Sequence, residues 1–205
     1  IPIMIKENLK TGQRQFVISS SGNAALAAAL FIEKYNQNNP GKLITLEIFI
    51  GKHINKEKLD RLLSLSSNAI KIFQNDRPKQ LSIQAQSAGK INLRQSTNDL
   101  ALIGYGELAR ELLKLSGLAA VFIPTSSGTT AQAVGEVFIK SPTKPQVHIV
   151  QTTACHPLVS EMDGSKIQKI HPEVQSLASA IVDRVAYRKE KVVKVAKGDQ
   201  ETSLK

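Results

Sequence analysis

Runs of apolar residues alternate along the chain with amphipathic stretches, and this pattern predicts a regular succession of strands and helices. Short apolar runs that end in turn residues predict strands at residues 16–19, 43–50, 69–73, 118–124 and 146–151. Helical spacing of apolar positions predicts helices at residues 24–35, 56–65, 78–88, 99–115, 131–138 and 173–187. The basic tail after residue 188 is compatible with either a strand or a helix. Because the strands are continuous apolar runs that alternate with helices, we expect an α/β protein with parallel sheets.

A break in this succession at residues 93–99 predicts two lobes. We expect a smaller α/β lobe at residues 14–97 and a larger α/β lobe at residues 98–205, with residues 1–12 as a helix of the larger lobe. The first residues, "IPIMIKENLKTG", have apolar positions at helical spacing but no capping residue ahead of them. We therefore expect that the chain begins inside a longer sequence.

Composition and charge limit the classes of function. The net charge of +10, from 27 Lys and Arg against 17 Asp and Glu, favours anionic ligands. The basic residues are scattered, and aromatic residues make up only 4%, so we expect no nucleic-acid partner. No apolar run approaches the roughly 18 residues of a membrane span, and the single cysteine excludes an internal disulfide. We therefore expect a cytoplasmic protein without a membrane partner.

Few side chains suggest metal or nucleophilic chemistry. The four histidines show no metal-ligand spacing with one another or with the single cysteine, so we expect no metal site. Cys155 and His156 are adjacent, which raises the possibility of a thiolate–imidazole pair. Neighbouring residues rarely face one another, and we expect Cys155 to act as a small buried apolar residue. Tyr105 is a weaker candidate for a substrate contact.

Two polar turns of the same kind stand between a predicted strand and a predicted helix. One is Ser19–Asn23, and the other is Thr125–Thr130. The first-turn N–H groups of a helix lack intrahelical partners, and Gly, Ser and Thr let an anion approach them. The alternative is simple N-capping, for which Ser and Thr are favoured. Neither turn has the pattern of a nucleotide-binding loop.

In tandem, these turns resemble those of a known enzyme family. "SSSGNAALAAAL" and "VFIPTSSGTTAQAVGEVF" are similar to the Ser-x-Gly-Asn turn and the phosphate loop of fold-type II pyridoxal-phosphate enzymes, the tryptophan synthase β-like group. "LRQSTNDLALIGYGELARELL" looks most like the threonine synthase side of this group, and "VHIVQTTACHPLV" is similar to the strand and turn that follow the phosphate helix. The resemblance implies two parallel-sheet lobes with a cofactor cleft between them, and β- or γ-elimination or replacement on an amino acid. It also implies a homodimer.

The resemblance assigns roles residue by residue. Asn23 would hydrogen-bond the 3′ oxygen of pyridoxal 5′-phosphate. The substrate carboxylate would be held by Ser20, Ser21 and Gly22. The cofactor phosphate would be held by Ser126, Ser127, Gly128, Thr129 and Thr130.

The catalytic lysine is the point at which the chain departs from the family. The Schiff-base lysine of the family lies in a Ser-x-Lys-Asp-Arg motif ahead of a helix that "IPIMIKENLKTG" resembles, and that motif would precede Ile1. Ser203, Leu204 and Lys205 have a similar form, so Lys205 is the candidate lysine. Two alternatives to a lyase or synthase follow: a non-catalytic homologue that keeps the fold and phosphate cradle, and a basic polyanion-binding protein.

Overall fold

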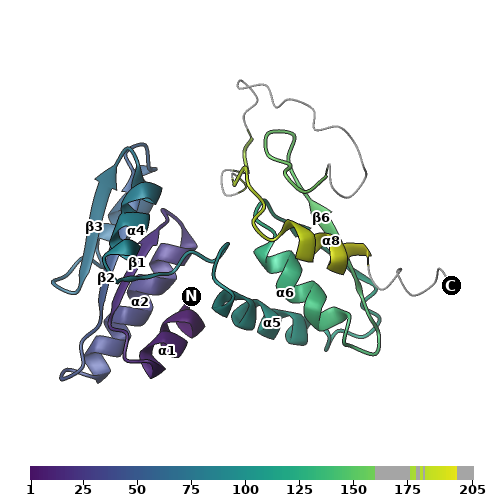
Figure 1. Cartoon of the computed structure of the whole chain (residues 1–205), viewed down its shortest axis with the longest axis horizontal. Coiled ribbons are helices and arrows are strands. Elements are labelled where there is room, and N and C mark those ends of the chain that lie inside the picture. The colour runs from purple at the N-terminus through teal and green to yellow at the C-terminus, as the bar shows by residue number, and fades with distance from the viewer. Residues whose placement is uncertain (160–175, 179–180, 182, 198–205) are drawn as a thin grey trace. The chain divides into compact units, whose positions relative to one another are not determined.

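The computed structural model describes residues 1–159, 176–178, 181 and 183–197 (Figure 1). The chain divides into two compact units, Ile1–Arg94 and Gln95–Lys205. Strands and helices alternate in both units, as the sequence predicts, and every strand pair in the two sheets is parallel. The prediction of an α/β protein with parallel sheets is therefore confirmed.

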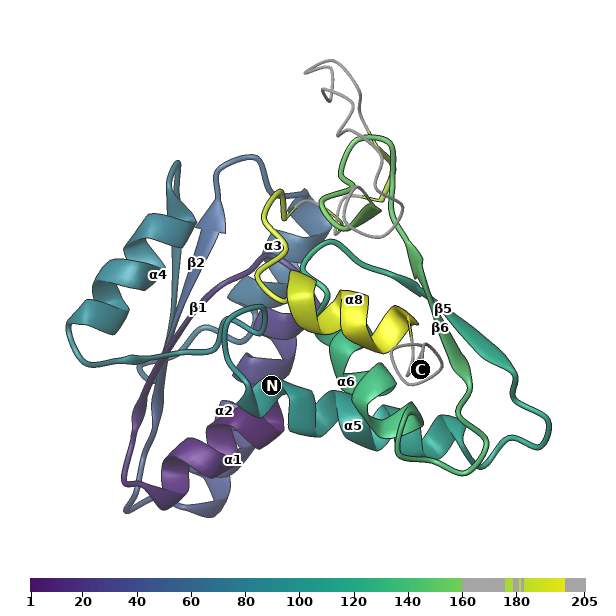
Figure 2. The ribbon, with the colours of Figure 1, turned by 45° about the vertical axis from the view of Figure 1, so that its right-hand side comes forward.

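Unit 1 is an open four-stranded sheet with helices on both faces. Its elements are α1 (Pro2–Lys10), β1 (Gln15–Ser19), α2 (Asn23–Asn38), β2 (Thr45–Gly51), α3 (Lys56–Leu63), β3 (Ile70–Asn75), α4 (Pro78–Ser87) and β4 (Ile91–Asn92). Figure 2 shows α4 on one side of β1 and β2, and α1, α2 and α3 on the other. The two-residue strand β4 is too short to leave an apolar run, and the sequence pattern does not predict it.

The order of the strands places β1 in the interior of the sheet. The order is β3-β2-β1-β4, so the chain runs outward from β1 to β3 and then returns to the other side of β1. Phe16, Val17 and Ile18 of β1 are buried, as expected for a strand covered on both faces. The direction of winding reverses between β1 and β4, and ligands of open α/β sheets bind at the carboxyl end of such a reversal.

Helix α2 carries the chain from β1 to β2. Its buried side chains recur at helical spacing, at Ala25, Ala28, Ala29 and Ile32. At its end, the Asn36 side chain accepts a hydrogen bond from the Ile44 N–H and donates one to the Ile44 carbonyl, each over 2.9 Å. This pair of bonds fixes where the chain enters β2.

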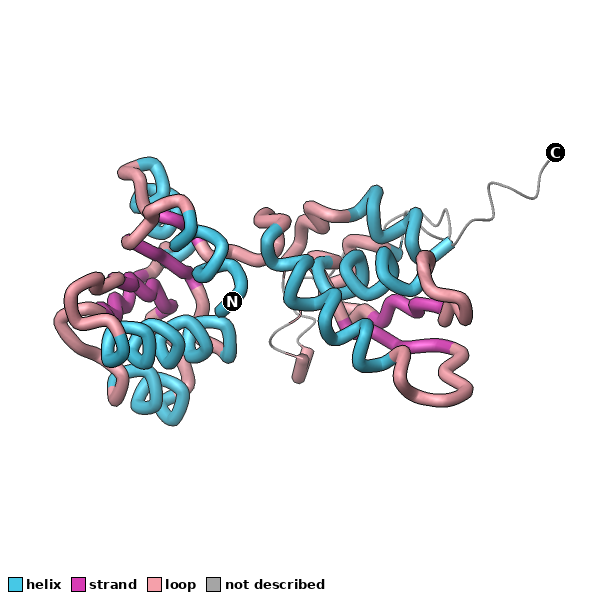
Figure 3. The backbone as a smooth tube through the Cα atoms, turned by 90° about the horizontal axis from the view of Figure 1, so that it is seen from below, coloured by secondary structure: helices cyan, strands magenta, loops and turns pink. Residues whose placement is uncertain are grey.

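Unit 2 is built around a two-stranded sheet. Its described elements are α5 (Leu100–Leu112), β5 (Ala120–Pro124), α6 (Thr129–Phe138), β6 (Gln146–Val150) and α8 (Lys189–Lys197). Figure 3 shows the helices of the chain in cyan and its strands in magenta. One face of the sheet joins the core, through a cluster that contains Ala109, Ile123, Ala131, Val134, Phe138, Val147, Leu158 and Val192. On β5 and β6, Phe122 and His148 stack at 4.6 Å between ring centroids, and Phe122 is 70% exposed.

The predicted helix at residues 173–187 is wrong wherever the structure describes it. Residues 176–178, 181 and 183–187 are not helical, and α8 begins at Lys189 instead. In this segment the Asp183 N–H donates to Ser126 Oγ over 3.2 Å, and the buried Arg188 directly precedes α8. Apolar residues at i and i+3, Val192 and Val195, are then buried along one side of α8.

Gly104 and Gly106 are placed within a helix and not at its start. Both lie inside α5, and a Cβ added at Gly106 would lie 3.5 Å from Val137 Cγ2 of α6. Tyr105 accepts a hydrogen bond from Gln95 Nε2 over 3.1 Å, which gives its hydroxyl a partner within the unit. Among the helices that the structure describes, none is long and apolar enough to cross a membrane.

Candidate functional site

The first polar turn lies at the carboxyl end of β1. Ser20, Ser21 and Gly22 connect this strand to α2, at the point where the winding of the sheet reverses. Gly22 occupies the N-cap position in an extended conformation, and no side chain caps the helix. The Ser20 hydroxyl accepts the Gly22 N–H over 3.3 Å. Ser21, Gly22 and Asn23 are exposed, and the first turn of α2 contains no acidic residue.

The second polar turn lies at the carboxyl end of β5. Gly128 occupies the N-cap position of α6 with φ of 87°, in the left-handed region that favours glycine. Its N–H donates to Thr125 Oγ1 over 3.0 Å, and the hydroxyls of Ser127 and Thr129 are hydrogen-bonded at 3.1 Å. No side chain caps α6, and its first turn has no acidic residue.

N-capping does not explain either turn. Helix α3 shows what a capped helix of this chain looks like, because Asn55 Oδ1 accepts the Lys58 N–H over 3.3 Å. By contrast, α2 and α6 both begin at a glycine without a side-chain cap, although serines or threonines stand directly before each glycine. The first-turn N–H groups of Thr129, Thr130 and Ala131 therefore have no intrahelical acceptor and lie at the positive end of the helix dipole.

Helix α8 forms one wall of the second turn. A Cβ added at Gly128 would lie 2.5 Å from Val192 Cγ2 and 3.6 Å from Arg188 Cβ. Ser126 and Thr129 are buried, whereas Ser127 and Thr130 are partly exposed. The exposed side of the turn is therefore the side of Ser127 and Thr130, and only glycine fits against α8 at position 128.

The site residues that the sequence predicts fall into two groups, one in each unit. Ser20, Ser21, Gly22 and Asn23 lie together in unit 1, and residues 126–130 lie together in unit 2. Lys205 lies outside the described residues, and its role as the catalytic lysine stays a prediction.

Cys155 and His156 have separate partners. The Cys155 thiol donates to the Asp183 carbonyl over 3.4 Å, and His156 Nδ1 lies 3.3 Å from the Thr152 carbonyl oxygen. Burial raises the pKa of the Cys155 thiol, and the Asp183 carboxylate raises it further, while Arg184 opposes both. A thiol held in its protonated form is a poor nucleophile, which fits a small buried residue better than a thiolate.

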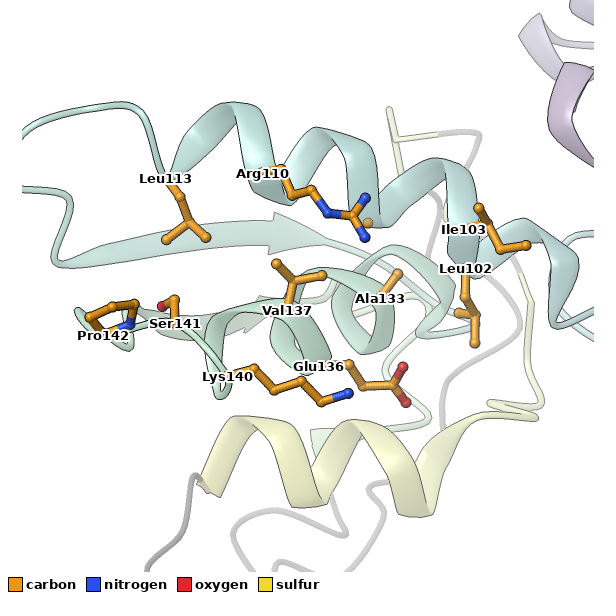
Figure 4. Close-up of a pocket in the computed structure, with 11 residues that line it drawn as sticks. Leu102, Ile103, Arg110, Leu113, Ala133, Glu136, Val137, Lys140, Ser141 and Pro142 are labelled. Atoms are coloured by element: carbon orange, nitrogen blue, oxygen red, sulfur yellow. The ribbon is translucent and has the colours of Figure 1, made fainter.

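The described residues contain no group of three or more His, Cys, Asp and Glu side chains that could hold a metal ion. The same part of the chain does contain two hollows. The larger, of about 570 Å³, lies between α5 and α6. Figure 4 shows Leu102, Ile103 and Leu113 on one side of it and Ala133 and Val137 on the other.

Neither polar turn lines the larger hollow. It begins at Ala133 and runs past the end of α6, away from the first turn of that helix. The charged residues among its lining are Arg110, Glu136 and Lys140. Figure 4 shows Glu136, from α6, and Lys140, from the segment that follows it, extending toward one another. This hollow therefore contains none of the site residues that the sequence predicts.

The smaller hollow, of about 370 Å³, was missed by the sequence reasoning. It includes Ser21 of the first polar turn, together with Lys52, His53, Asn75 and Asp76. A signal was present in the sequence, because these residues stand at or directly after the ends of predicted strands.

The sequence reasoning also missed Arg188, which is buried beside Gly128 of the second polar turn. Nothing in its sequence neighbourhood distinguishes it from the other cations of the basic tail.

Comparison with solved structures shows where this architecture occurs. The processed form of threonine deaminase isoform 2 from Solanum lycopersicum matches with a TM-score of 0.67 at 18% identity, over 88% of this chain and 52% of that one. A pyridoxal 5′-phosphate-dependent aspartate racemase matches with a TM-score of 0.73 at 17% identity, over 94% and 57%. Maize serine racemase matches with a TM-score of 0.70 at 18% identity, over 89% and 54%.

These similarities show the fold, and the chain spans about half the length of those structures. No curated protein matches the sequence. The sequence profile of a family described as "Pyridoxal-phosphate dependent enzyme" matches residues 2–201, which is almost the whole chain.

Pyridoxal phosphate is the cofactor of that family, and the second polar turn fits its phosphate. The uncapped first-turn N–H groups of α6 and the neighbouring hydroxyls form a set of donors suited to a dianion. The first turn of α6 has no carboxylate that would repel such a group. With the parallel α/β architecture and the matched profile, the chain belongs to the family of pyridoxal-phosphate-dependent enzymes, with a fold of type II.

Proposed function

We propose that this protein acts on a small amino acid as a pyridoxal-phosphate-dependent lyase or synthase of the threonine synthase-like group. The observation that carries the proposal is the pair of uncapped helix starts at the carboxyl ends of β1 and β5. Each has glycine at the N-cap and hydroxyl side chains beside it. The reaction would be an elimination or a replacement at the β or γ carbon.

The turn at the start of α6 would hold the cofactor phosphate. The N–H groups of Thr129 and Thr130 donate from the helix, and the hydroxyls of Ser127 and Thr130 donate from the exposed side of the turn. The Ser126 hydroxyl already accepts the Asp183 N–H, which fixes the wall of the turn. Fixed donors of this kind need no rearrangement when the anion binds.

The turn at the start of α2 would hold the substrate and orient the cofactor ring. Ser20, Ser21 and Gly22 would bind the amino-acid carboxylate through hydroxyl and N–H donors, and Asn23 would hydrogen-bond the ring oxygen. Bound pyridoxal phosphate supplies an electron-withdrawing ring that stabilises negative charge at the substrate α carbon. The protein side chains contribute binding and orientation, and Lys205 is the candidate for covalent attachment.

The test is a titration of the full chain with pyridoxal phosphate, followed by absorbance between about 300 and 500 nm, as the ring's chromophore requires. We expect saturable binding that is much tighter than that of pyridoxal, which lacks the phosphate. The double variant Ser127→Ala, Thr130→Val should weaken binding by about tenfold or more, because it removes two hydrogen bonds to a charged group. The matched double variant Ser116→Ala, Thr143→Val, at two exposed positions of the same unit, should bind like the wild type.

Borohydride reduction and intact mass then test the covalent step. A permanent adduct mapped to Lys205 would support a lyase or synthase. Reversible binding without an adduct would indicate the non-catalytic homologue, which keeps the phosphate cradle and lacks the chemistry. Absence of saturable binding would contradict the proposal. We further propose a homodimer, and a monomeric mass by sedimentation velocity at micromolar concentration would contradict it.

A further inference from the structure

Arg188 stands at the wall of the second polar turn. A Cβ added at Gly128 would lie 3.6 Å from Arg188 Cβ, and the Arg188 carbonyl accepts the Val192 N–H over 2.9 Å at the start of α8. Figure 2 shows α8 beside α6. The segment ahead of Arg188 contacts the same turn, because the Asp183 N–H donates to Ser126 Oγ over 3.2 Å. The backbone around Arg188 is therefore held against the turn.

The guanidinium of Arg188 reaches α6 one helical turn beyond its N-cap. Nη1 donates to Gln132 Oε1 over 3.1 Å, and the Gln132 N–H donates to the Gly128 carbonyl over 2.9 Å. Gln132 Nε2 donates to Glu136 Oε1 over 2.7 Å, so the side-chain amide of Gln132 is held at both ends. One residue, Gln132, therefore connects the cation to the glycine at the N-cap of α6.

The charge of Arg188 is only partly neutralised. Nη1 lies 2.8 Å from Asp99 Oδ1, but the Arg188 side chain is 6% exposed and that of Asp99 is 87% exposed. Its other acceptors, Gln132 Oε1 and the Gln95 carbonyl oxygen, carry no net charge. Nε is buried and has no hydrogen-bond partner among the described residues. A buried cation that is opposed by a water-screened carboxylate keeps much of its field inside the protein.

Stability of the fold does not by itself account for this charge. An apolar side chain of similar volume can replace a buried ion pair with little loss of stability, and a buried N–H without an acceptor is unfavourable. A buried cation is favourable where an anion binds close by, because water screens the two charges less than at the surface. The anion for which the second polar turn is suited is the phosphate of pyridoxal phosphate.

We propose that Arg188 is a positioning residue that sets the affinity of the second polar turn for the cofactor phosphate. Through Gln132 and α8, it fixes the orientation of the N–H donors at the start of α6. Its charge favours the dianion, and Asp99 moderates that effect. This inference rests on the proposed function, because that function assigns the phosphate to this turn.

The test measures how much the phosphate contributes to cofactor affinity. The quantity is the dissociation constant of pyridoxal divided by that of pyridoxal phosphate, obtained by isothermal titration calorimetry of the full chain. Asp99→Asn should raise this ratio by about twofold to fivefold, because the opposing charge is lost while the amide oxygen still accepts from Arg188. Glu111→Gln makes the same change of charge at an exposed position of α5 and, as the matched control, should leave the ratio unchanged.

Variants of Arg188 test the cation directly. Arg188→Met keeps an unbranched side chain without the charge and should lower the ratio by about tenfold, the order expected for a buried charge near a dianion. Arg188→Lys keeps the charge and should lower the ratio less. If Arg188 served only the fold, its variants would weaken pyridoxal and pyridoxal phosphate alike, and Asp99→Asn would leave the ratio at the wild-type value. Asp99→Asn decides the question even if Arg188→Met does not fold.

The results separate this inference from the proposed function. If the wild type prefers pyridoxal phosphate but the ratio is the same in Asp99→Asn and Arg188→Met, the role of Arg188 is overturned and the proposed function stands. Inorganic phosphate, titrated by calorimetry, tests the turn without the pyridine ring. If pyridoxal phosphate does not bind but inorganic phosphate binds with the same dependence on Asp99 and Arg188, the proposed function fails and the role of Arg188 stands. Binding of neither would contradict both.

Discussion

Arg188 donates from Nη1 to Asp99 Oδ1 over 2.8 Å, across 89 positions of the chain. The same guanidinium donates to Gln132 Oε1 over 3.1 Å and, from Nη2, to the Gln95 carbonyl over 3.2 Å. Arg188 is buried, and its Cβ stands next to Gly128. One side chain therefore connects the segment before α8, the middle of α6 and the start of α5.

Removal of this side chain should destabilise unit 2. Arg188→Ala leaves the oxygens of Gln132 and Gln95 without that donor, and we expect a loss of about 2–4 kcal/mol in the free energy of unfolding. Asp99→Asn should cost less than about 1 kcal/mol, because the side chain of Asp99 is 87% exposed. Urea unfolding followed by circular dichroism measures both, with Arg184→Ala at an exposed position as the control. Equal losses for Arg188→Ala and Arg184→Ala would contradict this reading.

Two glycines inside helices should respond to alanine with opposite signs. At Gly135, an added Cβ would lie 2.6 Å from Val195 Cβ and Cγ2, so Gly135→Ala should destabilise the protein by about 1–3 kcal/mol. At Gly106, the nearest atom is Val137 Cγ2 at 3.5 Å, and the higher helix propensity of alanine should make Gly106→Ala neutral or stabilising by about 1 kcal/mol. Thermal unfolding distinguishes the two. A Gly135→Ala variant as stable as Gly106→Ala would contradict this prediction.

The first polar turn should matter little for folding. Asn55→Ala removes a true cap, and we expect it to cost about 0.5–2 kcal/mol. Ser21→Ala and Asn23→Ala remove side chains that cap nothing, and each should change stability by no more than about 0.5 kcal/mol. The comparison requires only unfolding curves for the three variants. A loss at Ser21 or Asn23 as large as that at Asn55 would show that the turn serves the fold.

Alkylation of Cys155 should require a high pH. Burial and the Asp183 carboxylate raise the pKa of the thiol, so iodoacetamide should react with a pH midpoint above that of a free cysteine peptide. Asp183→Asn removes the second cause and should lower the midpoint. The folded protein holds the thiol proton more tightly than the unfolded chain does. The contribution of the Cys155 thiol to stability is therefore fully present below the pKa of the unfolded thiol, and it declines as the pH rises above that value.

Sequence pattern was sufficient for most of unit 1 because almost every element there has a hydrophobic period of its own. Each of its longer strands has an apolar run, and each helix has a regular apolar spacing or a start signal such as Pro78. The placement of Ser20–Asn23 after a buried strand followed directly from this pattern. The strand β4 pairs with β1 at Phe16 and Val17. It was not predicted, because its two residues are too few to show an alternation of apolar and polar positions.

The end of unit 2 could not be predicted in this way, because long-range contacts decide its structure. The predicted helix at residues 173–187 rested on spacing alone, whereas the Asp183 N–H is bound to Ser126, 57 positions away. Sequence spacing also could not show whether the serines and threonines of the two polar turns cap the helices that follow them. The distinction depends on the backbone at Gly22 and Gly128, which places glycine and not a hydroxyl residue at each N-cap.

The packing of α8 against Gly128 and Gly135 has a consequence for the order of events during synthesis. The four strands of unit 1 come from the first 94 residues, so this sheet can close while the ribosome is still translating the rest. One wall of the second polar turn, in contrast, is formed by α8, and Val192 of this helix is translated about 60 codons after Gly128. The nascent chain therefore forms its first polar turn early and completes its second polar turn late.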